Sequence, residues 1–417
     1  AFLPISHSIP ESAGLVIDSP GGRIVHTGDF KLDPTPGVGE PWDEALWREA
    51  TAGPVRALVC DSTNVFSPHE GRSEAGLADP IAALVAEAPH MVVATTFASN
   101  VARVKTLAEA GQAAGRSVCL LGRAMRRMIE AAIKTGVVDD FPKTITPEDA
   151  RDVPRENLML IVTGSQGERR AASAQLSRGK YLGLQMAEGD TFLFSSKTIP
   201  GNERSVGRIL NAFSEMGVEV VAEDDRYHVS GHANRPDLER MHALVDPDIV
   251  IPMHGEHRHL RAHAKLAGAG GRASKVVVNG AICDLTRSEP HVVEHVEADR
   301  IYLDGDILIG ALDGIVRDRI RLALNGHVIV QVIVEDDAPL GDPWVELVGL
   351  PETGGSRAPL AEILEEDLGQ FLMRAGRKTL RDDDALEDEL RRIVRKTALG
   401  EIGRKPEVTV VVSRLED

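Results

Sequence analysis

Histidine and aspartate residues follow apolar, strand-like segments at four separate points of this 417-residue chain. Each of these segments ends at one of His7, Asp29, Asp61 and His254. In open α/β sheets, ligands bind at the carboxyl ends of the strands, so we expect these side chains to gather at one edge of a sheet. Imidazole nitrogens and carboxylate oxygens are the donors that a borderline metal ion prefers. One such strand would mean little, but the four together predict a metal-assisted hydrolase.

A polar loop before the last of these segments adds further candidates. Residues 227–232 read Tyr-His-Val-Ser-Gly-His, and His254 follows His232 by one helix-and-strand step. Both histidines should therefore return to the same edge of the sheet. The small residues Ser230 and Gly231 leave room for a ligand beside backbone N–H groups, which is the arrangement of a phosphate-binding nest.

Each of these residues taken alone has an ordinary structural explanation. His7 fits a histidine that caps a loop, Asp29 fits a turn residue, and His228 fits a hydrogen-bonding residue at the loop entrance. His26, three positions before Asp29, is expected to face the opposite side of its strand. The prediction of a site therefore depends on the recurrence of the pattern along the chain.

Length and composition indicate a globular protein of two or three domains. The chain has 42% hydrophobic residues, and its longest apolar runs are far shorter than a membrane span. The first residues show no secretory leader and the cysteines form no CxxC pair, so we expect reduced thiols and a cytoplasmic location. Because the chain opens at Ala1 on the end of a predicted strand, we also expect further sequence to precede it.

The charge pattern gives two opposing indications about nucleic acid. A formal net charge of −17 argues against a nucleic-acid partner. However, lysines and arginines concentrate in one central region, where they would form either a basic channel for phosphates or a solvated helix face. These residues are Arg103, Lys105, Arg116, Arg123, Arg126, Arg127 and Lys134, followed by Arg169, Arg170, Arg178 and Lys180.

The middle of the chain alternates between helical and strand-like apolar spacing, which predicts βαβ units and a largely parallel sheet. Predicted strands cover residues 90–96, 117–121, 157–162, 218–222, 248–252 and 275–278, and predicted helices cover 75–88, 99–113, 123–135, 203–216, 235–245 and 257–267. Residues 15–18 and 23–26 form a predicted hairpin. Short strands within 300–335, helices at 358–374 and 383–398 and a strand at 407–412 predict a small C-terminal α+β part.

Seven short strings occur in order along the chain and carry a family resemblance. They are SHSIPES from residue 6, HTGDFKLD from 26, DSTN from 61, TFASN from 96, TGSQGE from 163, HVSGH from 228 and MHGE from 253. Together they closely resemble the ribonuclease J family of metallo-β-lactamase-fold, β-CASP nucleases, over residues 1–417. The resemblance implies an α/β protein in which a metallo-β-lactamase αββα sandwich carries an inserted β-CASP domain and a small C-terminal α+β domain.

The implied domain boundaries lie where the chain leaves and rejoins the first sheet. Residues 1–71 would form the first part of the metallo-β-lactamase domain, truncated at its N terminus, and 72–215 the β-CASP domain. Residues 216–288 would complete the metallo-β-lactamase domain. Residues 289–335 would form a β-rich segment and linker, and 336–417 the C-terminal α+β domain.

The resemblance also implies roles for individual residues. His7, Asp29 and His254 would be metal ligands, with Asp29 bridging two ions. His232 would act on the scissile phosphate and its leaving group, and Asp61 would support the histidines of the site. The implied substrate pocket, which holds a nucleotide phosphate, consists of His228, Val229, Ser230, Gly231 and His232 together with Ala98, Ser99 and Asn100.

The activity implied by the resemblance is 5′-to-3′ exoribonuclease activity with endonuclease capacity, in mRNA decay and rRNA maturation. The expected substrate is single-stranded RNA with a 5′-monophosphate, and the expected cofactors are two zinc ions, or manganese or magnesium. The expected assembly is a homodimer or homotetramer that works with other RNA-decay proteins.

One departure from the family pattern matters. The family's HxHxDH motif is absent from these 417 residues, so the chain alone is expected to lack a complete metal shell. The alternative interpretation is therefore a non-catalytic RNA-binding or assembly subunit of an RNA degradation complex. The presence or absence of HxHxDH in the complete gene product would discriminate between the two.

Overall fold

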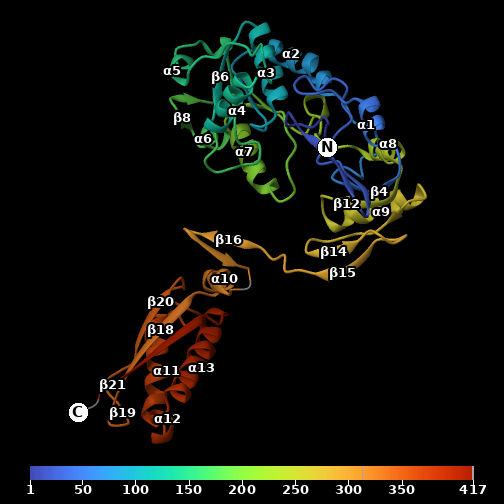
Figure 1. Cartoon of the computed structure of the whole chain (residues 1–417). Helices are drawn as coiled ribbons and strands as arrows, with labels where there is room; N and C mark the ends of the chain where they lie inside the picture. The colour runs from blue at the N-terminus through green and yellow to red at the C-terminus, as the bar shows by residue number, and fades with distance from the viewer. Residues whose placement is uncertain (312, 416–417) are drawn as a thin grey trace. The chain divides into compact units, whose positions relative to one another are not determined.

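The computed structural model of the chain describes residues 1–311 and 313–415. The chain divides into two compact units, Ala1–Val296 and Glu297–Asp417 (Figure 1). Each unit has its own sheet structure and its own buried apolar core. Among the described residues, no helix is long and apolar enough to cross a membrane.

The first unit contains a six-stranded sheet built from segments near both of its ends. The strand order is β1 (Phe2–Pro4), β2 (Ala13–Ser19), β3 (Gly22–His26), β4 (Val55–Asp61), β12 (Pro247–Met253) and β13 (Ala273–Ser274). β2 and β3 form the predicted antiparallel hairpin, whereas β3, β4, β12 and β13 run parallel. Three helices contribute to the same core: α1 (Glu44–Ala50), α8 (Arg235–Val245) and α9 (His257–Ala269).

The sequence of β4, Val-Arg-Ala-Leu-Val-Cys-Asp, explains its central place in this sheet. Nearly continuous apolar runs are typical of strands that are covered on both faces. Leu58 and Cys60 of β4 are fully buried, as is Val25 of the neighbouring β3. Trp47 of α1 packs into the same core, and its indole N–H donates to the Pro4 carbonyl at 2.8 Å. This shared core fixes the positions of the strand ends.

A second sheet of five parallel strands is inserted between β4 and β12. Its order is β11 (Glu219–Val221), β10 (Thr191–Phe194), β5 (Val92–Thr95), β7 (Leu158–Val162) and β6 (Ser117–Leu121). Helices α2 (Ala78–Glu87), α3 (Val101–Ala113) and α4 (Arg123–Lys134) cover one face, and α6 (Ala172–Leu176) and α7 (Glu203–Glu215) cover the other (Figure 1). Val92 and Ala94 face the first core and Val93 the second, as the two-residue period of a strand requires.

Shorter elements complete the connections of this insert. They are η1 (Glu74–Leu77), α5 (Pro147–Ala150), η2 (Arg155–Asn157), β8 (Lys180–Tyr181), β9 (Leu184–Gln185) and η3 (Asp225–Tyr227). The chain enters the insert through η1 and leaves it through η3. The polar loop of residues 228–232 then begins directly after η3.

The predicted strand at residues 275–278 is wrong. β13 is only two residues long, and residues 275–278 lie outside any strand. Because β13 is the edge of the sheet, these valines have no neighbouring strand to cover them, and Val278 is 50% exposed. β14 (Ala281–Asp284) and β15 (His291–His295) then form an antiparallel hairpin.

The second unit contains a hairpin, a helix and a four-stranded sheet. β16 (Ile301–Asp304) pairs with β17 (Ile307–Gly310), and α10 (Ile315–Asn325) follows. In the sheet, β18 (His327–Glu335) pairs antiparallel with β19 (Ala338–Pro339) and β20 (Trp344–Val348), and parallel with β21 (Glu407–Leu415). The core beside this sheet takes in leucines of α11 (Leu360–Arg374), α12 (Arg377–Arg381) and α13 (Asp383–Ile402). The leucines of the predicted C-terminal helices thus serve the unit's own core.

Helix α10 corrects the prediction of short strands throughout residues 300–335. Its segment Arg319-Ile320-Arg321-Leu322 alternates polar and apolar residues as a strand does. Ile320 remains 53% exposed, and α10 has no buried residue among those described. In addition, β18 lies before residue 336, so the sheet of the second unit begins earlier in the chain than the expected C-terminal domain.

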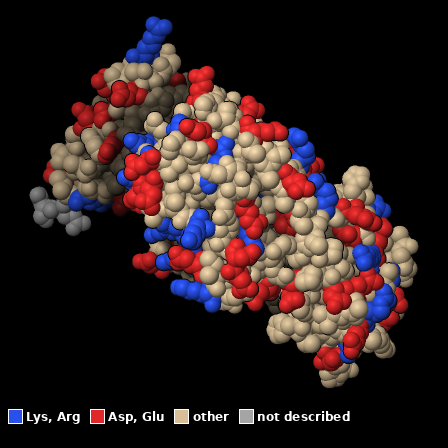
Figure 2. Space-filling view, turned by 90° about the horizontal axis from the view of Figure 1, so that it is seen from above, with Lys and Arg blue, Asp and Glu red and all other residues tan. Residues whose placement is uncertain are grey.

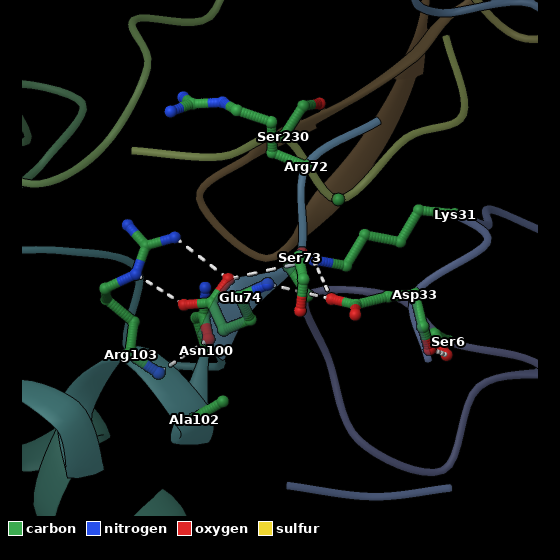
Figure 3. Close-up of polar contacts among 12 residues, drawn as sticks. Ser6, Lys31, Asp33, Arg72, Ser73, Glu74, Asn100, Ala102, Arg103 and Ser230 are labelled. Atoms are coloured by element: carbon green, nitrogen blue, oxygen red, sulfur yellow. Dashed lines mark hydrogen bonds and ion pairs between the residues drawn. The ribbon is translucent and has the colours of Figure 1, made fainter. Parts of the chain in front are cut away.

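Buried charge joins the two sheets of the first unit (Figure 3). Arg103 of α3 is fully buried and donates two hydrogen bonds to Glu74, at 2.5 and 3.0 Å. Lys31, in the segment after β3, pairs with Asp33 at 2.8 Å and lies 3.8 Å from Glu74. We call Lys31, Asp33, Glu74 and Arg103 the buried charge cluster. It links the segment after a strand of one sheet to a helix of the other.

Several cations of the predicted basic channel have structural partners instead. Arg103 belongs to the buried charge cluster, and Lys105 pairs with Asp140 at 2.5 Å. Arg116, which lies between α3 and β6, is buried. Its guanidinium donates to the carbonyls of Val85, Ala88 and His90, at and after the end of α2. Figure 2 shows Lys and Arg interspersed with Asp and Glu over the visible face. The expectation of a basic channel is therefore wrong for these three residues.

Removing one member of the buried charge cluster should destabilise the first unit strongly. Arg103→Met leaves Glu74 buried without its main partner, and such an uncompensated charge costs about 3–5 kcal/mol of unfolding free energy. Urea unfolding of the variant and the parent protein measures this loss. Arg48→Ala is the control, because the exposed Arg48–Glu44 pair should contribute less than about 0.5 kcal/mol. A loss below about 1 kcal/mol for Arg103→Met would contradict the role of the cluster.

Candidate metal centre

The structure places the five predicted ligand and catalytic residues at one edge of the six-stranded sheet. His7 follows β1, Asp29 follows β3, Asp61 ends β4 and His254 follows β12. β3, β4 and β12 are parallel, and β1 shares their direction because both β1 and β3 are antiparallel to β2. The carboxyl ends of these strands therefore meet at one edge. His232 reaches it from the polar loop before α8, with its ring centroid 5.0 Å from that of His7.

His7 is held in one tautomer by the polar loop. Its Nδ1 lies 2.6 Å from the Gly231 carbonyl oxygen, which can only accept, so Nδ1 carries the hydrogen. Burial lowers the pKa of His7, although the bond to Gly231 opposes this effect, so the ring is neutral at physiological pH. The lone pair is then on Nε2, which lies 3.9 Å from Asp29 Oδ2. A neutral imidazole fixed through its second nitrogen is the usual form of a histidine metal ligand.

Asp29 lies between His7 and His254. Its Oδ1 is 3.1 Å from His254 Nδ1, yet this buried oxygen has no hydrogen-bond partner among the described residues. Buried polar atoms are rarely left without a partner, so this oxygen is open to a cation. His254 has a φ of +67°, in the left-handed region that non-glycine residues seldom occupy. Such strained positions occur where the surroundings hold a functional side chain in place.

His232 and Asp61 form a hydrogen-bonded pair. His232 Nδ1 lies 2.7 Å from Asp61 Oδ2, and the N–H and hydroxyl of Thr63 donate to Asp61 Oδ1. Burial alone would raise the pKa of Asp61, but the bonds from His232 and Thr63 hold it below its usual range. Burial alone would lower the pKa of His232, yet the hydrogen bond and charge of Asp61 raise it. His232 can therefore carry a proton near neutral pH and exchange it through Nε2.

The donor atoms of this site form a compact group. One ligand-type atom each of His7, Asp29 and His232 lies within 4.8 Å of the other two. The resemblance assigns ligand roles to His7, Asp29 and His254 and a catalytic role to His232. The geometry brings all four side chains together. His232 would therefore lie next to a metal ion held by the other three.

The polar loop is fixed by the segment that follows β4. Asn64 donates to the Ser230 hydroxyl oxygen at 2.9 Å and to the His232 carbonyl at 3.1 Å. Ser230 Oγ also accepts the His232 N–H at 3.2 Å. Because Ser230 accepts both bonds, its own hydroxyl hydrogen remains to be donated to a ligand.

Gly231 has a different role from the one predicted. A Cβ at this position would lie 2.6 Å from Ser8 Oγ and 2.8 Å from His7 Cε1. The space beside the glycine is therefore filled by His7 and Ser8, and the expectation that it leaves room for a ligand is wrong. Glycine is needed here because His7 packs directly against the loop backbone.

The buried charge cluster reaches the entrance of the polar loop. Arg103 donates to the Tyr227 carbonyl at 3.3 Å and lies 3.5 Å from His228 Nδ1. Burial, together with the charges of Arg103 and other nearby cations, lowers the pKa of His228 to about 3. Asn100 caps α3 by accepting the Arg103 N–H at 3.0 Å. Through Arg103, the segment after β5 and the entrance of the polar loop are therefore connected.

The other predicted pocket residues have varied surroundings. Ala98 and Ser99 are half-buried in the segment after β5, directly before the capping Asn100. Val229 is buried, and its side chain belongs to the apolar core of the five-stranded sheet. Only the backbone of Val229 is therefore placed to face a ligand in the loop.

His26 stands at the end of β3, three positions before Asp29. Burial lowers its pKa, and the charge of His254 lowers it further while that of Asp29 raises it. Its Nδ1 accepts the Gly28 N–H at 3.0 Å. β3 ends at His26, so strand alternation does not extend to Asp29, and the expectation of opposite faces stays a prediction.

Sequence reasoning missed a second buried group of ligand-type side chains. Cys60, His242 and His263 place donor atoms within 4.8 Å of one another. Nε2 of His242 lies 2.9 Å from Nε2 of His263, whose Nδ1 is 2.8 Å from the Ser62 hydroxyl. Burial lowers the pKa of His242 to about 3 and that of His263 to about 4, and it raises the pKa of the Cys60 thiol. No motif marks this group, because packing of α8 and α9 against β4 brings it together.

Three family models match successive parts of the chain. The model for "Ribonuclease J, beta-CASP domain" matches residues 89–213. The model for "Zn-dependent metallo-hydrolase RNA specificity domain" matches 217–278, and that for "Ribonuclease J C-terminal domain" matches 314–415. These matches and the α/β architecture confirm the predicted metallo-β-lactamase and β-CASP fold class.

Curated relatives match nearly the whole chain. Ribonuclease J of Sinorhizobium meliloti is 37% identical over 415 residues, which cover 99% of this chain and 73% of that protein. Ribonuclease J of Thermus thermophilus is 32% identical over 417 residues, which cover 98% of this chain and 71% of that protein. Ribonuclease J of Corynebacterium glutamicum is 35% identical over 87% of this chain, which spans 51% of that protein. The chain belongs to the ribonuclease J family, which confirms the resemblance seen in its motifs.

Replacing the partner of His232 should lower the pKa of that histidine. The hydrogen bond and charge of Asp61 are the main causes that raise this pKa against burial, with a smaller contribution from Asp29, so Asp61→Asn should lower it. NMR titration of labelled histidines measures the change. Asp43→Asn, at the N-cap of α1, is the matched control and should leave the His232 titration unmoved. A His232 pKa that stays raised in Asp61→Asn would refute the pairing.

Acid should destabilise the first unit through its buried neutral histidines. The pKa of His242 is about 3 in the fold and about 6.5 in an unfolded chain, so the unfolded state binds the proton first as pH falls. Stability is then lost from about pH 6.5 downward, at about 1 kcal/mol per pH unit for each such histidine. Urea unfolding of the parent and of His242→Gln between pH 7 and 5 should give a shallower pH slope for the variant. Parallel slopes would count against a neutral buried His242.

Proposed function

We propose that this chain is the hydrolytic part of a metal-dependent ribonuclease that degrades single-stranded RNA from its 5′ end and also cleaves internally. The observation that carries the proposal is the convergence of His7, Asp29 and His254 beside the His232–Asp61 pair. Metal ligands next to an acid–base histidine are what phosphodiester hydrolysis requires. The names of the ribonuclease J relatives support RNA as the substrate.

Zinc is the proposed cofactor, held in part by His7, Asp29 and His254. The donors fit, because His7 is neutral with its lone pair on Nε2, and Asp29 has a buried oxygen without a hydrogen-bond partner among the described residues. Asp29 presents one oxygen toward each histidine, as a carboxylate shared by two ions would. Zinc supplies Lewis-acid activation of water and of the phosphoryl group. Manganese or magnesium would supply the same chemistry with a stronger preference for oxygen donors.

The chain's own groups position the substrate and move a proton. Asp61 fixes His232 through Nδ1 and favours its protonated form. Protonated His232 stabilises negative charge on the phosphate and donates its Nε2 proton to the departing 3′ oxygen. Asp61 stays ionised and offsets the charge of the imidazolium throughout.

The polar loop is the proposed binding site for a 5′ monophosphate. Ser230 has a hydroxyl hydrogen to donate, and the charges of Arg103, Lys197 and Arg72 all act on the neighbouring His228. A positive potential and a hydroxyl donor favour a phosphate dianion. A triphosphate is larger and more charged, so it should fit the loop less well.

We further propose a place for this activity in mRNA decay and rRNA maturation in the cytoplasm, with other RNA-decay proteins as partners. Free thiols at Cys60, Cys119 and Cys283 are in keeping with a reducing compartment. Assembly into dimers or tetramers would use the second unit, where β21 pairs with β18 along one edge. A long edge strand of this kind is open to pairing with a second copy.

A second candidate is a non-catalytic RNA-binding or assembly subunit of a degradation complex. The observation that favours it is the absence of an HxHxDH string from these 417 residues, which leaves His7, Asp29 and His254 as the assigned ligands. RNA hydrolysis by the product of the complete gene separates the two candidates. Turnover that depends on metal supports the enzyme, and metal-independent binding without turnover supports the subunit.

His254→Ala should remove an imidazole ligand from the metal centre. In the product of the complete gene we expect hydrolysis of a 5′-monophosphorylated RNA to fall by at least about 100-fold, together with bound zinc. Activity assays and elemental analysis of the purified protein measure both quantities. His257→Ala changes a histidine of the α9 start instead and should retain both properties. Unchanged activity with unchanged metal content would rule out the assignment.

Ser230→Val should impair trimming from the 5′ end more than internal cleavage. The variant loses the hydroxyl donor and adds bulk in the proposed phosphate pocket, whereas an internal site needs no terminal phosphate. Rates on 5′-monophosphorylated and circular RNA compare the two activities. Ser230→Thr keeps the hydroxyl, so its rate of trimming from the 5′ end should lie between those of Ser230→Val and the parent. Equal losses on both substrates would show that the loop serves the metal centre in general.

A further inference from the structure

Phe66 is a large aromatic side chain that the fold leaves 54% exposed. It stands in the segment after β4, two positions beyond Asn64, whose amide binds the polar loop. Val65 directly before it is buried in the apolar core of the six-stranded sheet, so the backbone is anchored while the Phe66 ring faces solvent. The core of this sheet does not include Phe66 among its described members.

A short series of contacts connects the Phe66 ring to the metal centre. The ring lies against His259 of α9, with centroids 5.1 Å apart and planes tilted by 54°. His259 packs against Gly255, where a Cβ would lie only 3.0 Å from His259 Cβ. Gly255 directly follows His254, whose Nδ1 is 3.1 Å from Asp29. The exposed ring is therefore linked to the metal centre through His259 and Gly255.

Cations lie beside this ring, and two of them also pair with carboxylates. The guanidinium of Arg258 lies 5.6 Å from the Phe66 centroid, and its Nε is 2.9 Å from Glu256. Phe66 and Val65 also line a cleft of about 310 Å³ whose other walls include Lys265 and Arg235, which pairs with Glu239 at 3.5 Å. Each nucleotide of single-stranded RNA offers a flat aromatic face and one negative phosphate. An exposed aromatic ring flanked by cations matches both features.

We propose that Phe66 is a stacking platform for a base of the RNA strand bound at the metal centre. Arg258, Arg235 and Lys265 would hold the neighbouring phosphates. This inference rests on the ribonuclease function proposed above and adds a subsite to it. Because every base has an aromatic face, the platform should add affinity without adding preference for a sequence.

A scan of single abasic nucleotides along a 5′-monophosphorylated 12-nucleotide RNA tests the platform. Binding is measured with the product of the complete gene in the presence of a chelator, so that the RNA stays intact. In the parent protein, one abasic position should weaken binding by about fivefold or more. Phe66→Ala should weaken binding of the unmodified RNA by a similar factor, and the same abasic position should then have no further effect. Phe66→Trp keeps an aromatic face and should preserve the abasic profile of the parent.

Ile133→Ala is the matched control. Ile133 is an apolar residue that is 47% exposed, and it lies on α4, a helix that covers the five-stranded sheet. It should leave both the affinity and the abasic profile unchanged. If Phe66→Ala keeps the abasic profile of the parent, the platform is overturned while the ribonuclease proposal stands. If the parent protein binds none of these RNAs, both are overturned. Metal-dependent hydrolysis, assayed separately, tests the ribonuclease proposal without reference to Phe66.

Discussion

The buried charge cluster is the interaction on which the site of this protein most depends. Lys31 lies two positions after Asp29. Arg103 donates a hydrogen bond to the carbonyl of Tyr227, the residue directly before His228. One end of the cluster thus fixes the segment that carries the candidate bridging carboxylate, and the other fixes the entrance of the polar loop. Buried ions that lose a partner are strongly destabilised, so the cluster allows little displacement of either segment. A five-stranded insert can therefore be accommodated between β4 and β12 without loosening the site.

Hydrogen bonds to two histidines then decide which ring nitrogen serves the chemistry. The Gly231 carbonyl takes the Nδ1 hydrogen of His7, and Asp61 takes that of His232. Both rings are left with Nε2 for the site, but their protonation states differ. Burial keeps His7 neutral despite its bond to the carbonyl, whereas the carboxylate favours a charged His232. The same imidazole group is thus suited to the proposed role of metal ligand in one place and of proton donor in the other.

The sequence predicts the features that depend on local pattern and strand order. The alternation of apolar segments located β6 at residues 117–121 and α8 at 235–245, and the residues after each strand located the site edge. It could not predict that Arg103 is buried, because its partners come from distant segments. The Cys60–His242–His263 group was missed for the same reason. Helix α10 was misread because residues 319–322 alternate polar and apolar side chains as a strand does.

The central claim is that imidazoles and a carboxylate at the edge of the six-stranded sheet bind catalytic metal. Anomalous diffraction at the zinc edge, from crystals of the complete gene product grown with zinc, tests it most directly. The account predicts zinc bonded to Asp29, His7 and His254, and none among Cys60, His242 and His263, where hydrogen bonds already join both rings. Zinc bound only at the Cys60–His242–His263 group, or the absence of zinc from Asp29, would contradict it.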